Sequence, residues 1–239
     1  MNTEIKNAIQ AADSEAQYDE SAKRLLAQKY VLAHILVRTV EEFQGMEIEK
    51  VVSLIEGDPY ISKIPVASGL TNKDRNVEGK RIVGLNTEAG ERNEGLVRFD
   101  IIFYVRMRNG LAQMIINVEA QKDEPGSYQI LNRAIFYVSR LISSQKERDF
   151  VKSNYNDVKT VYSIWVCMNM PENSMCHIHL VQDDLIDAKQ WKGDLDIPNI
   201  IMIGLGKEIP EQDEKYELHR LLGTLLSEKL SAEEKLQRV

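Results

Sequence analysis

Residues 95–121, GLVRFDIIFYVRMRNGLAQMIINVEAQ, decide the fold of this chain. Two runs in this stretch, Leu96–Val105 and Leu111–Gln121, are rich in Val, Ile, Phe and Tyr, as β-strands are. Between them lies Asn109-Gly110, and Asn-Gly is one of the strongest short-range signals for a hairpin turn. The stretch therefore predicts an antiparallel hairpin.

The register of this hairpin would bring two carboxylates together. If the turn is centred between Asn109 and Gly110, the numbers of paired residues add up to 219, and Asp100 faces Glu119. Facing Cβ atoms lie about 4.5–5.5 Å apart, so the two charges would repel. A divalent cation such as Mg²⁺ or Mn²⁺ would remove this repulsion, since Mg²⁺ binds carboxylate oxygens. Two opposed charges can also arise by chance on a solvated hairpin, and the residues leave both interpretations open.

Gln121 adds a polar group to the same cluster. Side chains alternate along a strand, so Gln121 shares a face with Glu119. The apolar residues Met114, Ile115 and Ile116 precede them and would shield the cluster from water. Three oxygen-bearing side chains on one face form a compact set of acceptors.

With these residues the chain resembles the PD-(D/E)XK nuclease superfamily, and more narrowly its branch of nuclease family transposases related to recombination-promoting nucleases. The resemblance rests on Asp100, Glu119-Ala120-Gln121 and the helix that follows, and it runs from about Tyr18 to beyond Asn169. Further stretches carry it: Gly84-Leu85-Asn86-Thr87-Glu88, Asn93-Glu94-Gly95, Ile115–Lys122, Ile142-Ser143-Ser144-Gln145 and Val161–Asn169.

The resemblance implies a restriction-endonuclease-like core and Mg²⁺- or Mn²⁺-dependent hydrolysis of DNA, linked to transposition or recombination. It assigns the metal to Asp100, Glu119 and the carbonyl group of Ala120, and catalysis to Asp100, Glu119 and Gln121. Glu88 and Glu94 are most simply explained as solvated loop carboxylates, and the resemblance leaves an additional acidic ligand at Glu94, or at Glu88, as the alternative.

The chain departs from the superfamily pattern at two positions. Phe99 precedes Asp100 where the superfamily name implies proline, and Gln121 stands where the lysine would be. An amide does not titrate, so Gln121 can orient water but cannot act as a general base. A second ion, or Lys122 bending back, could supply the missing positive charge.

The helix after the hairpin is expected to contact DNA. Ser127 is a favourable N-cap for a helix that runs to about Gln145. At 100° per residue, one arc is apolar and should pack on the sheet: Leu131, Ala134, Ile135, Val138, Leu141 and Ile142. The opposite arc carries the residues that we predict to bind DNA, although a solvated helix face would look the same: Gln129, Arg133, Tyr137 and Arg140.

The other segments complete an α/β or α+β fold, a mixed central sheet flanked by helices. Apolar spacing predicts helices over 20–42 and 48–55 and after Pro210, and strands over 64–66, 81–86, 158–169, 175–182 and 199–205. His177 and His179 share a strand face, but without an evident third ligand they do not predict zinc. The leucines of the last helix would pack on the core or on a second subunit, so a homodimer is one expected assembly: Leu218, Leu221, Leu222, Leu225 and Leu226.

Composition sets the remaining limits. The 239 residues suit a polar lead-in over 1–19, a nuclease-like domain over 20–209 and a helical segment over 210–239. No apolar run approaches the roughly 18 residues of a membrane span, and the two cysteines form no disulfide framework, so we expect a cytoplasmic protein. The net charge of −7 disfavours a surface that grips DNA everywhere, but allows a local basic patch. The alternative function is a degenerate nuclease fold that only binds nucleic acid or protein; an RNA nuclease is a further alternative.

Overall fold

The computed structural model describes residues 15–61, 88–90, 96–98, 100–108, 113–122, 126–146, 149–150, 152–187, 189 and 191–238. The strands expected over 64–66 and 81–86, the residue Glu94 and the Asn109-Gly110 turn lie outside these residues. The helices are α2 (Glu15–Leu26), α3 (Lys29–Thr39), α4 (Ile48–Leu54), α5 (Ile130–Ser143), α6 (Glu217–Leu225) and α7 (Ala232–Arg238), with short 3-10 turns η1 (Glu41–Phe43), η2 (Tyr155–Asp157) and η3 (Glu214–Tyr216). The strands are β1 (Ile55–Ile61), β2 (Glu88–Gly90), β3 (Leu96–Arg98), β4 (Ile101–Arg106), β5 (Gln113–Gln121), β6 (Val161–Met170), β7 (Ser174–His179) and β8 (Pro198–Gly206).

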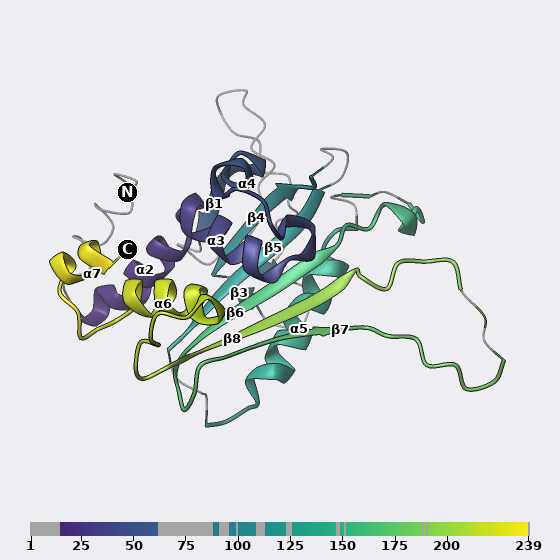
Figure 1. Ribbon diagram of the computed structural model, residues 1–239. Helices are drawn as coiled ribbons and strands as arrows, with labels where there is room; N and C mark the ends of the chain where they lie inside the picture. Colours follow the sequence, from purple (N-terminus) through teal and green to yellow (C-terminus); the bar gives the residue numbers. More distant parts are fainter. Residues whose placement is uncertain are drawn as a thin grey trace.

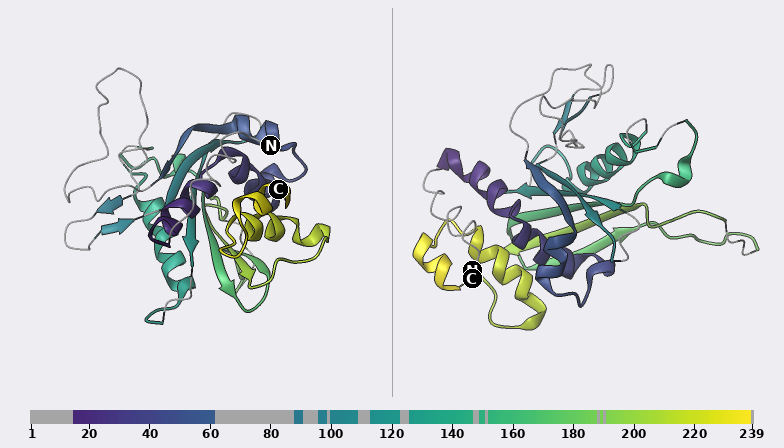
Figure 2. Two further views of the ribbon diagram at one scale, coloured as in Figure 1. Left: turned by 90° about the vertical axis from the view of Figure 1, so that its left-hand side faces the viewer. Right: turned by 90° about the horizontal axis from the view of Figure 1, so that it is seen from above.

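A mixed six-stranded sheet forms the centre of the molecule, in the order β1-β4-β5-β6-β8-β7. Strands β5, β6 and β8 run parallel to one another, whereas the pairs β1–β4, β4–β5 and β7–β8 are antiparallel. Helix α5 connects β5 to β6 and covers one face of the sheet, and the N-terminal and C-terminal helices cover the other (Figures 1 and 2). The expected fold class, a mixed sheet flanked by helices, is confirmed.

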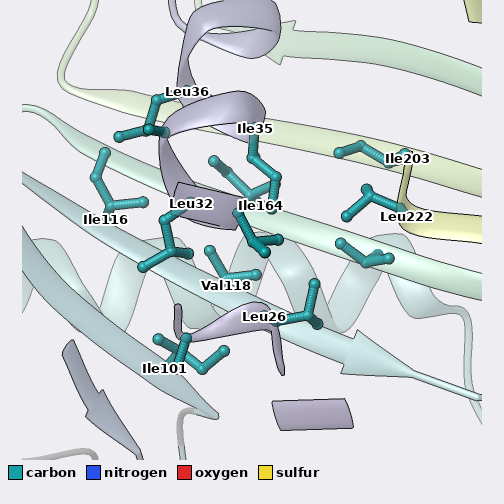
Figure 3. Packing of buried hydrophobic residues seen from close by; sticks show 14 of the residues in the cluster. Leu26, Leu32, Ile35, Leu36, Ile101, Ile116, Val118, Ile164, Ile203 and Leu222 are labelled. Carbon is teal, nitrogen blue, oxygen red and sulfur yellow. The ribbon is translucent and has the colours of Figure 1, made fainter. Parts of the chain in front are cut away.

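The larger core lies between the sheet and the N-terminal helices. Figure 3 shows Leu32, Ile35 and Leu36 of α3 above Ile116 and Val118 of β5. The helix expected over 20–42 contributes its apolar positions to this core, but it is broken into α2 and α3 at Gln28, whose backbone is extended. Neither Gly nor Pro marks this break, so the local sequence gives no signal for it.

The hairpin has the predicted register but not the predicted strand lengths. Pairs such as Ile101 with Val118 and Val105 with Met114 add up to 219. The run from Leu96 to Val105, however, is not one strand, because β3 pairs with β2 in a separate two-stranded sheet and β4 begins only at Ile101. Asp100 therefore lies at the break between two sheets.

The edge strand β1 was not predicted from the sequence. Strand β1 pairs with β4 across an irregular stretch between Glu56 and Tyr60, where Gly57 has a φ of 58°. In the sequence, Gly57-Asp58-Pro59 looks like the turn that ends the preceding helix, but Pro is tolerated in an edge strand at such a bulge.

Helix α5 is rotated relative to the predicted orientation. Tyr137 and Arg140, expected on the outer arc, are buried, whereas Leu131 and Ile135, expected against the sheet, are exposed. Ala134, Val138 and Leu141 of the predicted arc are buried as expected, so the prediction was correct for half of that arc and wrong for Leu131 and Ile135. The apolar arc of this helix is wider than the side that the sheet covers, so placing residues at 100° intervals does not select which part of it is buried. The helix begins at Ile130 after Gln129, without a side-chain cap, so Ser127 is not its N-cap.

The C-terminal elements agree with expectation. Strand β8 is mostly buried between β6 and β7, and α6 packs Leu218, Leu222 and Leu225 on the core. These leucines contact the chain's own core, so they carry no argument for a second subunit. No helix among the described residues is both long enough and apolar enough to cross a membrane.

Candidate active site

The side-chain carboxylates of Asp100 and Glu119 each accept a hydrogen bond from the backbone of the other residue's segment. The backbone N–H of Asp100 donates to Oε1 of Glu119 at 3.0 Å, and the backbone N–H of Ala120 donates to Oδ2 of Asp100 at 3.0 Å. Each carboxylate is thus fixed by a backbone group of the opposite strand. The sequence prediction that the register brings these two residues together is confirmed.

Strand alternation turns both side chains toward α5. Residues Ile102, Tyr104 and Ile115 belong to the core beneath α5, so by the period of two Asp100 and Glu119 lie on this face as well. The pair lies at the end of β5 and just before β4, and on the other side of β5 Glu119 is paired with Trp165 of β6. The two carboxylates therefore meet at the carboxyl end of a parallel strand, where ligands commonly bind in open α/β sheets.

Glu119 is an almost fully buried carboxyl group, 2% exposed. Burial raises its pKa well above the ordinary value, and the neighbouring charge of Asp100 raises it further. Hydrogen bonds and the positive charge of Arg133 oppose this shift without cancelling it. A cation bound beside Glu119 would favour its ionised form.

A buried amide that the sequence analysis missed lies next to Glu119. Asn117 is fully buried, and its Nδ2 lies 3.3 Å from Oγ of Ser163, which also accepts from Nε1 of Trp165 at 3.0 Å. Its Oδ1 is buried and accepts no hydrogen bond from the described residues. The available signal was its position two residues before Glu119, on the same strand face.

Arg133 brings a positive charge to the carboxylates. Its guanidinium lies 3.8 Å from Oε2 of Glu119 and 3.4 Å from Oε1 of Gln121. The hydroxyl groups of Tyr128 and Tyr137 accept from it at 2.9 and 2.8 Å, and it stacks 5.3 Å from the ring of Trp165. These contacts fix the guanidinium beside Glu119 and Gln121.

A second positive charge comes from α2. Nζ of Lys23 lies 3.0 Å from Oδ1 of Asp100, although α2 is distant in sequence and packs with the opposite core. Sequence analysis could not find Lys23, because nothing in the local pattern of α2 distinguishes it from a solvated lysine. Lys122 does not bend back toward the site as considered above, since its Nζ binds Glu228 at 2.6 Å.

The predicted DNA-contact residues divide into two groups. Gln129 is exposed and Arg133 is half-buried at the site. Tyr137 and Arg140 are buried, with Arg140 only 7% exposed and its guanidinium 5.9 Å from the ring of Phe136. These two residues are packed into the protein and do not form an outer DNA-contact surface.

The donor set suits a hard cation. No group of three or more His, Cys, Asp and Glu residues gathers around one point in the described parts of the chain, and Glu88 lies in β2. Mg²⁺, however, is usually held by only one or two carboxylates together with water and substrate phosphate. Asp100, Glu119 and the unsatisfied Oδ1 of Asn117 provide such oxygens within one small region. His177 and His179 share a face with ring centroids 4.8 Å apart, and His177 binds Asn199, with no third ligand among the described residues.

Comparisons with known proteins identify no relative. No family model, no curated protein and no solved structure matches this chain. The resemblance to nuclease family transposases therefore stays a prediction.

Proposed function

We propose that this chain is a Mg²⁺-dependent DNA endonuclease of the PD-(D/E)XK type, with a restriction-endonuclease-like core. The observation that carries the proposal is the Asp100–Glu119 pair, with Glu119 buried and Asp100 half-buried, held by reciprocal hydrogen bonds at the end of β5. Placing a second carboxylate beside a buried one is costly, and such pairs occur preferentially at functional sites. The order of hairpin, helix α5 and parallel strand β6 is compatible with such a core.

Asp100, Glu119 and the carbonyl group of Ala120 would hold the ion. When bound, Mg²⁺ or Mn²⁺ would lower the pKa of water and neutralise charge that builds on the phosphate. Asn117, whose buried Oδ1 has no donor among the described residues, would interact with water next to Glu119.

Three side chains of this protein would act on the substrate. Gln121 lies on the same strand face and would orient the attacking water through its amide, without taking the proton. Arg133 offers a planar fork of donors, which suits a phosphate oxygen. Lys23, beside Asp100, would take the place of the lysine that is missing at residue 121. The positive charge thus comes from helices α2 and α5, and not from the strand.

DNA is the substrate that this surface favours. Tyr128 is exposed next to Arg133, and an aromatic ring beside a guanidinium suits a base or sugar next to a bound phosphate. The positive charges of Lys23 and Arg133 lie close to the carboxylates. DNA would therefore bind at this site even though the whole chain carries a net charge of −7.

A second candidate is a nuclease fold that no longer cuts. Lys23 and Arg133 already partly neutralise Asp100 and Glu119, so the pair is compensated without an ion. A degenerate site of this kind would bind nucleic acid or protein and be indifferent to metal.

Cleavage of plasmid DNA by the purified protein in Mg²⁺, with EDTA as the metal-free control, separates the two candidates. The nuclease proposal requires nicking or linearisation that EDTA stops and that Asp100→Asn abolishes. Binding of DNA that is equal in Mg²⁺ and EDTA, without cleavage in either, would favour the degenerate module.

A further inference from the structure

The four carboxylate oxygens of the Asp100–Glu119 pair have partners of two kinds. Oδ2 of Asp100 and Oε1 of Glu119 each accept a hydrogen bond from a backbone N–H of the opposite segment, at 3.0 Å. Of the other two oxygens, Oδ1 of Asp100 lies 3.0 Å from Nζ of Lys23. Oε2 of Glu119 lies 3.8 Å from the guanidinium of Arg133. Each carboxylate therefore binds the backbone with one oxygen and faces a positive charge with the other.

The oxygens that face Lys23 and Arg133 are also those that a divalent ion would use. The other oxygen of each carboxylate accepts a backbone hydrogen bond that joins the two segments. An ion and an ammonium group that both lie against Oδ1 of Asp100 would repel each other strongly, because the Coulomb energy of like charges rises as their distance falls. Metal binding and the Lys23–Asp100 ion pair are therefore competing states of the site.

Arg133 is fixed at the site, whereas Lys23 can move. The guanidinium of Arg133 donates to the hydroxyl groups of Tyr128 and Tyr137 at 2.9 and 2.8 Å, and it lies 5.3 Å from the Trp165 ring. Lys23 carries a compact charge on a flexible stem, and its side chain is 20% exposed, so its ammonium can reach the surface. Of the two, Lys23 is the side chain that can leave its carboxylate.

We propose that Lys23 exchanges anions when the site is loaded: without a metal ion it pairs with Asp100, and with the ion bound it moves to a DNA phosphate. This inference rests on the proposed function and adds to it a link between metal binding and DNA binding. The ammonium of Lys23 is repelled from Oδ1 of Asp100 by the ion and is attracted to a phosphate beside the site. DNA is then held more firmly when the site carries the ion that cleavage needs.

The exchange has two thermodynamic consequences. Lys23 competes with the ion, so the protein binds metal more weakly than the two carboxylates would without this lysine. By linkage, the binding of metal and the binding of phosphate strengthen each other, because each takes one partner of the same ion pair. Arg133 stays in place and contributes to phosphate binding in both states.

Calorimetric titration of the purified protein with Mn²⁺ in the absence of DNA tests the competition. Lys23→Met keeps the apolar stem and removes the ammonium, so its affinity for Mn²⁺ should be at least about fivefold higher than that of the parent. Arg24→Met removes one positive charge from the neighbouring, exposed position of α2 and should bind Mn²⁺ as the parent does. Circular dichroism verifies that both variants are folded. If Lys23 only held α2 in place, its removal would weaken metal binding instead.

The salt dependence of DNA binding tests the move to phosphate. Fluorescence anisotropy of a labelled duplex is measured at several salt concentrations in Ca²⁺, which prefers the same carboxylate oxygens, and in EDTA. Lys23→Met should lower the slope of log K against log salt by about one in Ca²⁺ and leave it unchanged in EDTA. Arg133→Ala should lower the slope in both conditions, because its guanidinium does not change partners. A gel of each sample verifies that the duplex stays intact.

The outcomes separate this exchange from the proposed function. Mn²⁺ binding that Lys23→Met leaves unchanged or weakens would overturn the exchange and leave the metal site standing. A slope change that is the same in Ca²⁺ and in EDTA for Lys23→Met would do so as well. Absence of Mn²⁺ binding in both the parent and Lys23→Met would overturn the metal site and the exchange together.

Discussion

Asp100 and Glu119 are joined by two reciprocal hydrogen bonds, each from a backbone N–H of one segment to the carboxylate of the other. The acceptor in both bonds is a single carboxylate oxygen, which an amide oxygen can replace. Substituting Asn or Gln therefore removes charge while it keeps the connection between the segments, so these isosteric changes separate chemistry from folding.

Asp100→Asn and Glu119→Gln should each abolish cleavage of DNA and leave the fold intact. The physical reason is the loss of a negative oxygen from the ion's ligand set, with the backbone donors still satisfied. Plasmid cleavage and thermal melting of the same preparations measure the two effects. Glu172→Gln, an exposed carboxylate on the β6–β7 turn, is the matched control and should cleave at the parental rate. Metal-dependent cleavage by both site variants at the parental rate would remove these residues from the mechanism.

The buried Glu119 predicts a pH-dependent stability. Its folded-state pKa is raised, chiefly by burial, whereas in the unfolded chain it titrates near 4.3. The folded form thus retains a proton that the unfolded form loses, so its contribution to stability is full below about pH 4 and is lost as the pH rises through the folded-state pKa. Glu119→Gln, which stays neutral, should become more stable than the parent as the pH rises from 5 to 8 in EDTA. Urea unfolding from pH 5 to pH 8 measures the difference, and a difference that does not change with pH would contradict it.

The two arginines of α5 should behave differently. Arg133→Ala should weaken DNA binding and lower the slope of log K against log salt by about one, because one phosphate contact is lost. Arg133→Lys keeps the charge but not the fork, and should restore part of the salt slope with less of the affinity. Arg140 is buried, so Arg140→Ala should lower the free energy of unfolding and leave the salt slope unchanged. Equal effects of both alanine substitutions on the salt slope would show that the helix face is wrongly assigned.

A lysine at residue 121 should be able to replace Lys23 as the positive charge beside the carboxylates. Gln121→Ala should slow cleavage by about tenfold to a few hundredfold, the size of one lost transition-state hydrogen bond. Lys23→Met, which keeps the apolar stem, should slow cleavage without weakening folding. The double variant Lys23→Met/Gln121→Lys moves the lysine to the strand and should recover activity that Lys23→Met alone loses. Since residue 121 supplies no base, Mn²⁺ should give a higher rate than Mg²⁺ at neutral pH. Parental rates in both Gln121→Ala and Lys23→Met would leave Asp100 and Glu119 as the only active groups.

The sequence predicted the parts of this fold that depend on local pattern. The pairing of Asp100 with Glu119 followed from the position of one Asn-Gly turn and the strand period, and both are local properties. Lys23 could not be predicted, since its approach to Asp100 depends on how α2 packs against the sheet. The orientation of α5 was also beyond local pattern: Ile135 and Phe136 are as apolar as the buried Val138 and Leu141, and only the shape of the sheet decides between them.

Calorimetric titration with Mg²⁺ and Mn²⁺ tests the central claim most directly, since it measures the ion at the carboxylate pair without depending on the choice of nucleic acid. The parent and the Glu172→Gln control should bind metal, and Glu119→Gln should bind it at least tenfold more weakly. No binding by the parent at millimolar metal, or equal binding by the parent and Glu119→Gln, would contradict a metal-dependent nuclease built on Asp100 and Glu119.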